Sequence, residues 1–99
     1  MKAAILLFGS LAAFAQAISI NFCTDANFGG TCGTYNVPNN ACWNVPAARN
    51  DKISSLDTFG ATCTFWRDGK CGGTSFKATG RNPLIPANMN DKISSLKCT

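Results

Sequence analysis

A stretch of seven residues occurs twice in the chain and carries the side chains best suited to binding chemistry. Residues 50–56 and residues 90–96 both read Asn-Asp-Lys-Ile-Ser-Ser-Leu, forty residues apart. An identical repeat of this length in a chain of 99 residues indicates two copies of one supersecondary unit. Within five residues each copy offers an amide, a carboxylate, a main-chain carbonyl and a hydroxyl oxygen, which are the ligand types that calcium prefers.

The repeated stretch therefore predicts two calcium sites. The candidate ligands are the side chains of Asn50, Asp51 and Ser54 with the carbonyl of Lys52, and the equivalent groups of Asn90, Asp91, Ser94 and Lys92. Each copy has one carboxylate and a neighbouring lysine whose charge opposes the ion, so we expect weak binding, with a Kd of about 0.01–1 mM. The alternative is a calcium-free turn, because Asn, Asp and Ser side chains also hydrogen-bond to nearby backbone.

The other polar residues argue against catalysis and against nucleic-acid binding. The chain has no His, and its five acidic residues are all Asp, so no general base with a tuned partner is evident and we expect no enzyme activity. Lys and Arg form no run. Dispersed basic residues are typical of a solvated surface rather than of a nucleic-acid or membrane footprint, so we expect neither partner.

Residues 1–17 have the features of a secretory signal peptide. A positive charge at Lys2 precedes an apolar run over residues 3–15, and small residues follow. A membrane-spanning helix needs about 20 apolar residues, and polar residues interrupt this run too soon. We predict cleavage after residue 17 and a secreted mature domain of residues 18–99, with a net charge of +3 once Lys2 is removed.

The mature chain contains all six cysteines: Cys23, Cys32, Cys42, Cys63, Cys71 and Cys98. A secreted chain this short buries a modest core, so an even number of cysteines predicts up to three disulfides. The cysteines alone leave about 15 connectivities open. A zinc site is disfavoured, because the chain has neither Cys-x-x-Cys pairs nor His.

The pattern of apolar residues predicts short strands. Residues 18–22 alternate between apolar and polar with period two, and we expect further strands at residues 31–36, 41–45, 56–59 and 63–66. No segment keeps a helical period for more than about two turns. The chain is therefore expected to be all-β.

The second half of the mature chain repeats the plan of the first. Residues 71–74 match residues 28–31 at an offset of 43, and residues 60–61 join a first motif of about 18–60 to a second of about 61–99. No Pro-, Gly- or Ser-rich linker separates the halves, so we expect one domain with a shared core. Two copies of four short strands predict a disulfide-bonded sandwich of two Greek keys.

A second shared pattern precedes each copy of the repeated stretch. Residues 23–30 and 66–73 share one spacing. Each segment begins with an aromatic residue or a cysteine, has a second such residue five positions later, and ends with a glycine two positions after that. Together with Asn-Asp-x-x-Ser-Ser, this pattern resembles the hallmark of the βγ-crystallin family, in which both large residues are aromatic. Here Cys23 and Cys71 each replace one aromatic. A disulfide could anchor the folded hairpin in its place; alternatively, these cysteines are simply small buried residues.

The resemblance covers the whole mature chain and implies how its residues share the two calcium sites. In that family one motif contributes its acidic residue and loop carbonyl, and the other contributes the fifth-position serine of the signature, here Ser54 or Ser94. A residue of the folded hairpin adds a further oxygen, for which the candidates are Thr24 or Asp25 in one site and Arg67 or Asp68 in the other. Ser55 and Ser95 would hydrogen-bond the hairpin of their own motif, and the apolar residues of each stretch would face the core: Ile53, Leu56, Ile93 and Leu96.

Two functions from different classes remain. The first is a calcium-stabilised structural or stress-related protein, which we expect to be a monomer. The second is a secreted interaction protein of the same fold, of the killer-toxin, antimicrobial or protease-inhibitor kind, which binds an unknown protein or cell-surface target. The second function needs an exposed apolar patch, for which the candidates are Tyr35, Trp43, Phe76 and the loop at residues 83–86. We expect instead that Leu84 and Ile85 of this loop are buried at one end of the sandwich.

Overall fold

The computed structural model describes residues 17–99, so the predicted signal peptide lies outside the described residues except for its last position. The strands are β1 (Ala17–Asp25), β2 (Gly29–Pro38), β3 (Trp43–Asn44), β4 (Ser55–Asp68), β5 (Gly72–Asn82) and β6 (Ser95–Cys98). Short 3-10 turns, η1 (Ala26–Phe28) and η2 (Gly69–Cys71), form the tips of the two long hairpins. The prediction of an all-β chain is confirmed.

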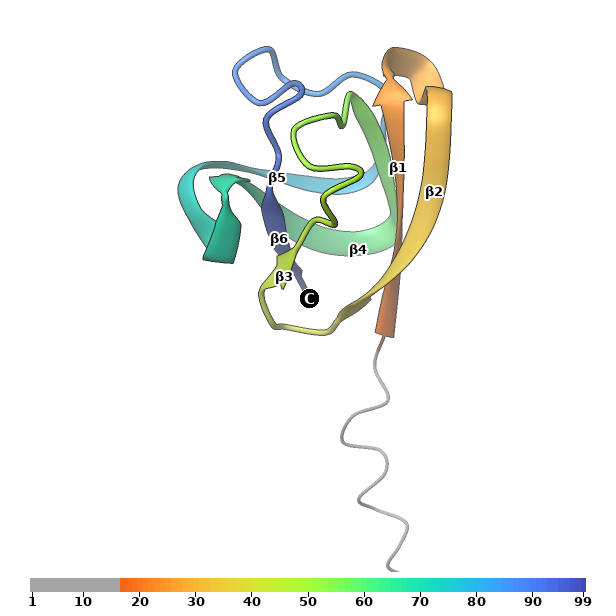
Figure 1. Cartoon of the computed structure of the whole chain (residues 1–99). Helices are drawn as coiled ribbons and strands as arrows, with labels where there is room; N and C mark the ends of the chain where they lie inside the picture. The colour runs from red at the N-terminus through yellow and green to blue at the C-terminus, as the bar shows by residue number, and fades with distance from the viewer. Residues whose placement is uncertain (1–16) are drawn as a thin grey trace, which may run out of the picture.

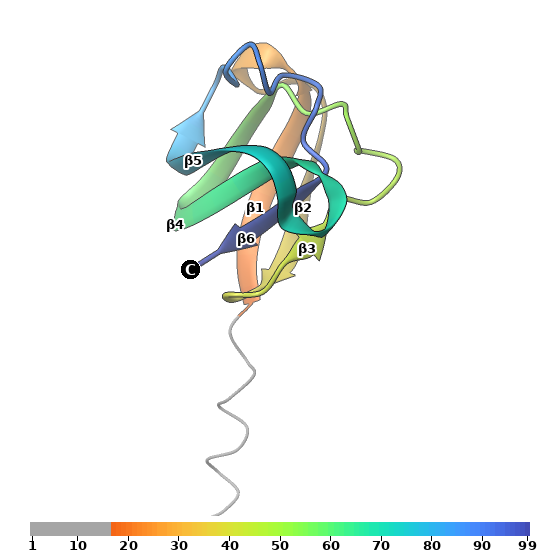
Figure 2. The ribbon, with the colours of Figure 1, turned by 90° about the vertical axis from the view of Figure 1, so that its left-hand side faces the viewer.

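The strands form a curled sheet whose two ends face each other as the layers of a sandwich (Figure 1, Figure 2). In the first layer β2 pairs with β1, and β1 pairs with the start of β4. In the second layer the remainder of β4 pairs with both β5 and β6. Strand β4 therefore passes from one layer into the other.

Each half of the chain also gives one strand to the layer of the other half. Strand β3, from the first half, pairs with β6 from the second, with Trp43 opposite Leu96. The end of β5, from the second half, pairs with the start of β4, with Asn82 opposite Leu56. These exchanged strands complete two interlocked Greek keys, and the predicted fold is confirmed.

Strand β4 differs from the prediction. The expected strands at residues 56–59 and 63–66 are one strand, with a shift of register against β5 where they meet. The side chain of Thr58 stabilises this bulge, since its hydroxyl accepts the Gly80 N–H at 2.6 Å and donates to the Ala61 carbonyl at 2.6 Å. Backbone groups that leave the ladder thus keep partners, which allows the strand to continue.

The core lies between the layers and draws on both halves. Its fully buried large side chains include Ile20, Phe22, Val37, Ile53, Leu56, Phe65, Ile85, Met89, Ile93 and Leu96. The four apolar residues of the repeated stretches are all among them, as predicted. Tyr35, Trp43 and Phe76 are half-buried and pack against this core, so they do not form the exposed aromatic patch that was considered for a partner.

All six cysteines are paired, as Cys23–Cys32, Cys42–Cys71 and Cys63–Cys98. The first bridge joins facing residues of β1 and β2, and the third joins facing residues of β4 and β6. The second bridge ties the tip of the second hairpin to the first half of the chain. Cys23 and Cys71, which replace family aromatics, are therefore both disulfide anchors of their hairpins.

Candidate functional site

The two repeated stretches fold into equivalent loops, one before β4 and one before β6. A proline begins each turn: the N–H of Asn50 donates to the carbonyl of Pro46, and the N–H of Asn90 donates to that of Pro86, both at 2.9 Å. The next residue is left-handed in each loop, with φ of 60° at Asp51 and 58° in the second copy. Asp tolerates this conformation better than most residues, so the same local sequence produces the same turn twice.

The loops lie against each other through reciprocal backbone bonds. The N–H of Asp51 donates to the carbonyl of Ile93 at 3.2 Å, and the N–H of Asp91 donates to that of Ile53 at 3.1 Å. These two bonds bring the aspartate of each loop next to the isoleucine near the end of the other loop.

At each crossing a carboxylate of one loop meets a hydroxyl of the other. Ser54 Oγ donates to Asp91 Oδ1 at 3.0 Å, and Ser94 Oγ donates to Asp51 Oδ1 at 3.1 Å. We call these pairs the Asp91 centre and the Asp51 centre. Both mix residues of the two halves, in the same way that the family resemblance implies for shared sites.

The serine that follows in each stretch holds the hairpin of its own motif, as predicted. Ser55 Oγ donates to the Asp25 carbonyl at 2.7 Å and accepts the Phe28 N–H at 3.0 Å. Ser95 Oγ donates to the Asp68 carbonyl at 2.5 Å and accepts the Cys71 N–H at 2.8 Å. Both serines are fully buried, so they connect the loops to the hairpins rather than to solvent.

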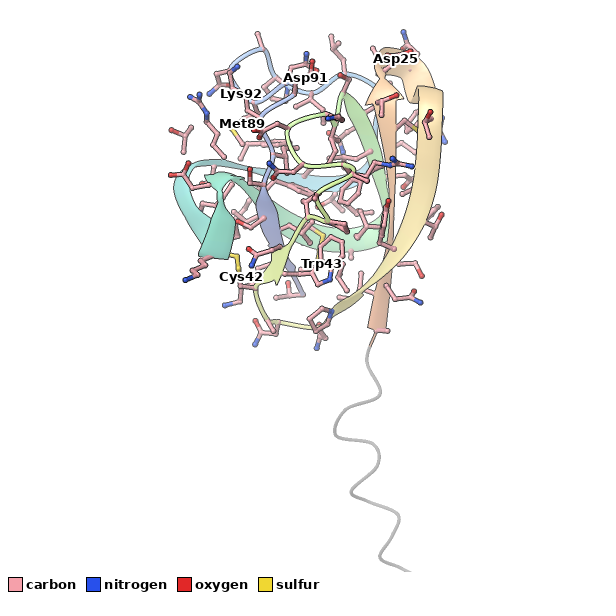
Figure 3. All side chains as sticks on the ribbon, viewed as in Figure 1. Asp25, Cys42, Trp43, Met89, Asp91 and Lys92 are labelled. Atoms are coloured by element: carbon pink, nitrogen blue, oxygen red, sulfur yellow. A yellow bond between two sulfur atoms is a disulfide. The ribbon has the colours of Figure 1, made fainter. Side chains whose placement is uncertain are left out.

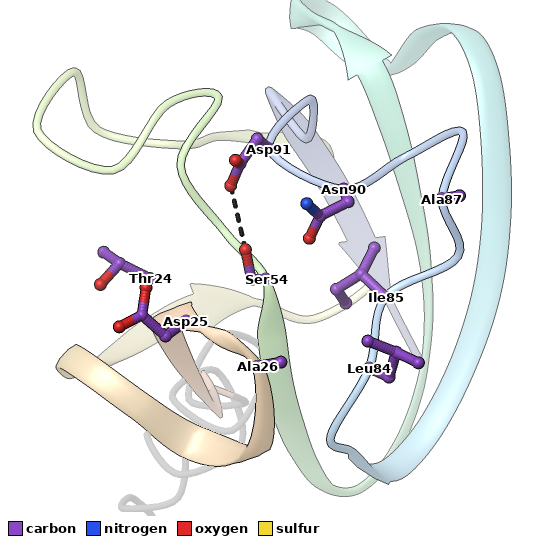
Figure 4. Close-up of a pocket in the computed structure, with 9 residues that line it drawn as sticks. All are labelled: Thr24, Asp25, Ala26, Ser54, Leu84, Ile85, Ala87, Asn90 and Asp91. Atoms are coloured by element: carbon purple, nitrogen blue, oxygen red, sulfur yellow. Dashed lines mark hydrogen bonds between the residues drawn. The ribbon is translucent and has the colours of Figure 1, made fainter.

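The Asp91 centre opens into a pocket of about 520 Å³ (Figure 4). Its lining residues are Thr24, Asp25, Ala26, Ser54, Leu84, Ile85, Ala87, Asn90 and Asp91. Three of the predicted ligands are thus brought together with both hairpin candidates, Thr24 and Asp25. In Figure 3, Asp25 lies at the end of β1 and Asp91 in the loop near it. Lys92 is exposed and is not among the lining residues.

The Asp51 centre has the same backbone frame at the other hairpin. The N–H of Ser94 donates to the Trp66 carbonyl at 2.9 Å, as the N–H of Ser54 does to the Cys23 carbonyl at 3.0 Å. The hairpin candidates Arg67 and Asp68 follow Trp66 directly and are exposed. Asn50 is half-buried and Lys52 is exposed.

The pocket includes apolar residues that we did not predict to be part of a calcium site. Ala26, Ala87 and Leu84 are among its lining residues. The prediction that Leu84 is buried is wrong: it is 72% exposed, whereas Ile85 beside it is 2% exposed and lies in the core as expected. The backbone explains the difference, since the Ile85 N–H donates to the Ser54 carbonyl at 3.2 Å and turns that residue inward.

The side chains that meet at the two centres carry oxygen atoms, from an aspartate and a serine in each. Among residues 17–99, no group of three or more His, Cys, Asp and Glu side chains is placed to hold a metal. Carboxylates are sparse, so an ion here would depend on amide, hydroxyl and carbonyl oxygens. Such a donor set suits calcium and does not suit zinc or copper, which prefer nitrogen and sulfur ligands.

In the described part of the chain, no helix is long and apolar enough to cross a membrane.

Solved structures resemble this fold closely, whereas no protein-family model and no curated protein matches the sequence. A βγ-crystallin domain from Flavobacterium johnsoniae is 30% identical, with a TM-score of 0.66 over 81% of this chain and 92% of that one. A βγ-crystallin domain from Clostridium beijerinckii is 23% identical, with a TM-score of 0.68 over 81% and 95%. A βγ-crystallin from Ciona intestinalis is 25% identical, with a TM-score of 0.66 over 82% and 99%.

Proposed function

The chain belongs to the βγ-crystallin family, and we propose that it is a secreted member in which two weakly bound calcium ions and three disulfides stabilise a small structural or stress-related domain. The observation that carries this proposal is the reciprocal pairing of Asp91 with Ser54 and of Asp51 with Ser94. Each pair joins the two halves of the chain, so an ion bound there would hold the native arrangement and would have no equivalent site in the unfolded chain.

The spacing of these oxygens supports a calcium ion. Oxygens about 3 Å apart can both contact one ion at the usual calcium–oxygen distance of about 2.3–2.6 Å. Asp91, Ser54 and Asn90, with an oxygen of Thr24 or Asp25, would hold one ion. The second ion would be held by the equivalent residues Asp51, Ser94 and Asn50 with Arg67 or Asp68, and the carbonyls of Lys52 and Lys92 complete the proposed ligand set.

The expected stabilisation is modest because each centre has few carboxylates. An ion that binds only the native state contributes about 1.4 kcal/mol at ten times its Kd. Two such ions contribute about 3 kcal/mol, which is a large share of the roughly 5–15 kcal/mol of stability of an ordinary domain. Calcium is abundant outside cells, so weak sites would be filled there. The three disulfides also indicate an oxidising environment.

Thermal unfolding of the oxidised mature domain tests the proposal. Calorimetry with millimolar calcium should give a Tm several degrees higher than calorimetry with chelator, because each kcal/mol shifts Tm by about 4–8 °C in a domain of this size. Asp51→Asn plus Asp91→Asn should abolish the shift, since it removes both carboxylate charges and keeps side chains that can still bond to the serines. Magnesium at the same concentration controls for ionic strength. An unchanged Tm up to about 10 mM calcium would show that the loops are turns without an ion.

A second candidate function is a secreted protein that binds a partner through the loop at residues 83–86. It is favoured by one observation, the 72% exposure of Leu84. Large apolar side chains in a rigid exposed loop can anchor a partner. Leu84→Ser should then weaken binding to a cell surface or a target protein and leave the calcium-induced Tm shift unchanged, whereas a structural protein would show neither binding nor a change.

A further inference from the structure

The duplication lets the two centres be compared position by position, and their surroundings differ. The residue before the Asn-Asp pair is Arg49 in one loop and Met89 in the other. The residue directly after Cys23 in the first hairpin is Thr24, and the residue directly after Trp66, at the matching position of the second hairpin, is Arg67. The backbone is equivalent at both places, so these pairs are substitutions within one shared framework.

The Asp91 centre has neutral neighbours at both of these positions. Met89 is fully buried, and Thr24 lines the pocket beside Asp91 and Ser54. The Thr24 hydroxyl accepts the Thr31 N–H at 3.0 Å, so it is held on its own hairpin. The charged residues of the turn and hairpin segments that form this centre are Asp91, Asp25 and Lys92, whose charges sum to −1.

The Asp51 centre has an arginine at each of the same positions. Arg67 follows Trp66, whose carbonyl accepts the Ser94 N–H at 2.9 Å, so its backbone is fixed next to that serine. Arg49 is in the turn itself, and its carbonyl accepts the Lys52 N–H at 3.1 Å. The charged residues of the turn and hairpin segments that form this centre are Asp51, Asp68, Lys52, Arg49 and Arg67, whose charges sum to +1.

Neither arginine is neutralised by a close carboxylate. Within residues 17–99 the one ion pair shorter than 4.0 Å joins Arg81 to Asp57. The Arg81 guanidinium also lies 4.1 Å from the centre of the Phe28 ring in the first hairpin, and its pairing with Asp57 offsets its charge there. The Nε of Arg49 is buried and has no hydrogen-bond partner. The positive charges of Arg49 and Arg67 would therefore oppose a divalent cation bound at the Asp51 centre.

We propose that the two centres are unequal, and that Arg49 and Arg67 are the residues that make the Asp51 centre the weaker calcium site. This inference rests on the proposed function, since it concerns the affinity of the same two centres. The difference of two charges acts on a doubly charged ion through partly exposed surroundings, where charge interactions are reduced but not removed. We expect the Asp91 centre to bind calcium about tenfold more tightly, so that it fills first.

The test is a calcium titration of the oxidised mature domain followed by NMR. The amide signals of Asp91 and Asp51 report the two centres separately, and each gives its own midpoint. In the native protein the Asp91 midpoint should come at about one tenth of the calcium concentration of the Asp51 midpoint. Raising the salt concentration should bring the two midpoints closer together, because salt screens exposed charges.

Substitutions taken from the equivalent positions supply the matched variants. Arg49→Met plus Arg67→Thr gives the Asp51 centre the neighbours of the other centre and should bring the two midpoints to within about threefold, if removing two like charges acts as expected. Thr24→Arg should raise the Asp91 midpoint. Arg49→Lys plus Arg67→Lys keeps both positive charges, so the two midpoints should stay as far apart as in the native protein. Calorimetry in chelator verifies that each variant is folded.

The outcomes distinguish the inference from the function on which it rests. Equal midpoints in the native protein, a reversed order, or a gap that persists after both arginines are replaced by neutral residues would overturn the inference alone. No shift at either amide would overturn the proposed calcium function and the inference with it. A gap that closes with the neutral variant and persists with the lysine variant would support both.

Discussion

Replacing Ser55 by Ala should destabilise the protein strongly although it removes a single oxygen. The hydroxyl makes two hydrogen bonds, to the Asp25 carbonyl at 2.7 Å and from the Phe28 N–H at 3.0 Å, and it is fully buried. After the substitution both backbone groups lose their partner. A buried group left unsatisfied costs about 1–3 kcal/mol, and the half-exposed tip of the hairpin gives water some access. We therefore expect a total loss of about 2 kcal/mol.

This loss can be measured by calorimetry and located by hydrogen exchange. About 2 kcal/mol corresponds to a decrease in Tm of roughly 8–16 °C for a domain of this size. The Phe28 amide should also exchange faster than in the native protein, because it is the donor that loses its acceptor. Measurements in chelator remove any contribution from bound calcium.

Two further variants make the result specific. Ser95→Ala removes the equivalent bonds in the second motif and should produce a similar loss. Ser75→Ala changes an exposed serine of β5 and should stay within about 0.5 kcal/mol of the native protein. If Ser55→Ala were as stable as Ser75→Ala, the serine would not be holding the hairpin and the reasoning would be refuted.

Two other substitutions test the disulfides and the hairpin tips. Cys42→Ser plus Cys71→Ser opens a bridge between residues separated by 29 positions. It should lower the free energy of unfolding, measured by urea denaturation, by about 3–4 kcal/mol, because the unfolded chain regains the entropy of the closed loop. A loss below about 1 kcal/mol would contradict this. Gly73→Ala should cost at least about 1 kcal/mol more than Gly60→Ala. Both glycines have positive φ, but a Cβ on Gly73 would lie 2.5 Å from Asp68 Oδ2, whereas a Cβ on Gly60 meets no atom within 4 Å. Equal losses of stability in the two variants, measured by calorimetry, would show that the Asp68 side chain moves aside at no cost.

Local patterns in the sequence predicted most of what lies inside the repeated stretches. The buried side of each stretch follows from Ile and Leu separated by polar residues, and the structure buries all four of these side chains. The hydrogen-bonding role of Ser55 and Ser95 followed from the family resemblance, and it is confirmed. The sequence also indicated that the cysteines are bridged, but not how, because the pairing depends on which strands face each other.

Features that depend on the meeting of distant segments were predicted less well. Strand β4 was expected to be two strands because glycine interrupts the apolar pattern, yet the distant Gly80 N–H bonds to Thr58 and keeps the bulge inside one strand. Leu84 was expected to be buried with Ile85, since nothing in a four-residue apolar loop tells which side chain the backbone turns inward. The bond from Ile85 to Ser54 makes that choice.

By itself the sequence determined that this protein has two equivalent units, which loop residues carry oxygen atoms, and which apolar residues of the repeated stretches are buried. These properties are local, because turn conformation and the period of apolar residues depend on neighbours along the chain. Only the tertiary structure decided that Asp91 faces Ser54 and that Asp51 faces Ser94, which strands are exchanged, and where the bridges form. It also brought the backbone beside Arg67 to Ser94, through the bond from the Ser94 N–H to the Trp66 carbonyl. The reason is that these contacts join segments about forty residues apart, whose proximity is set by the packing of the shared core.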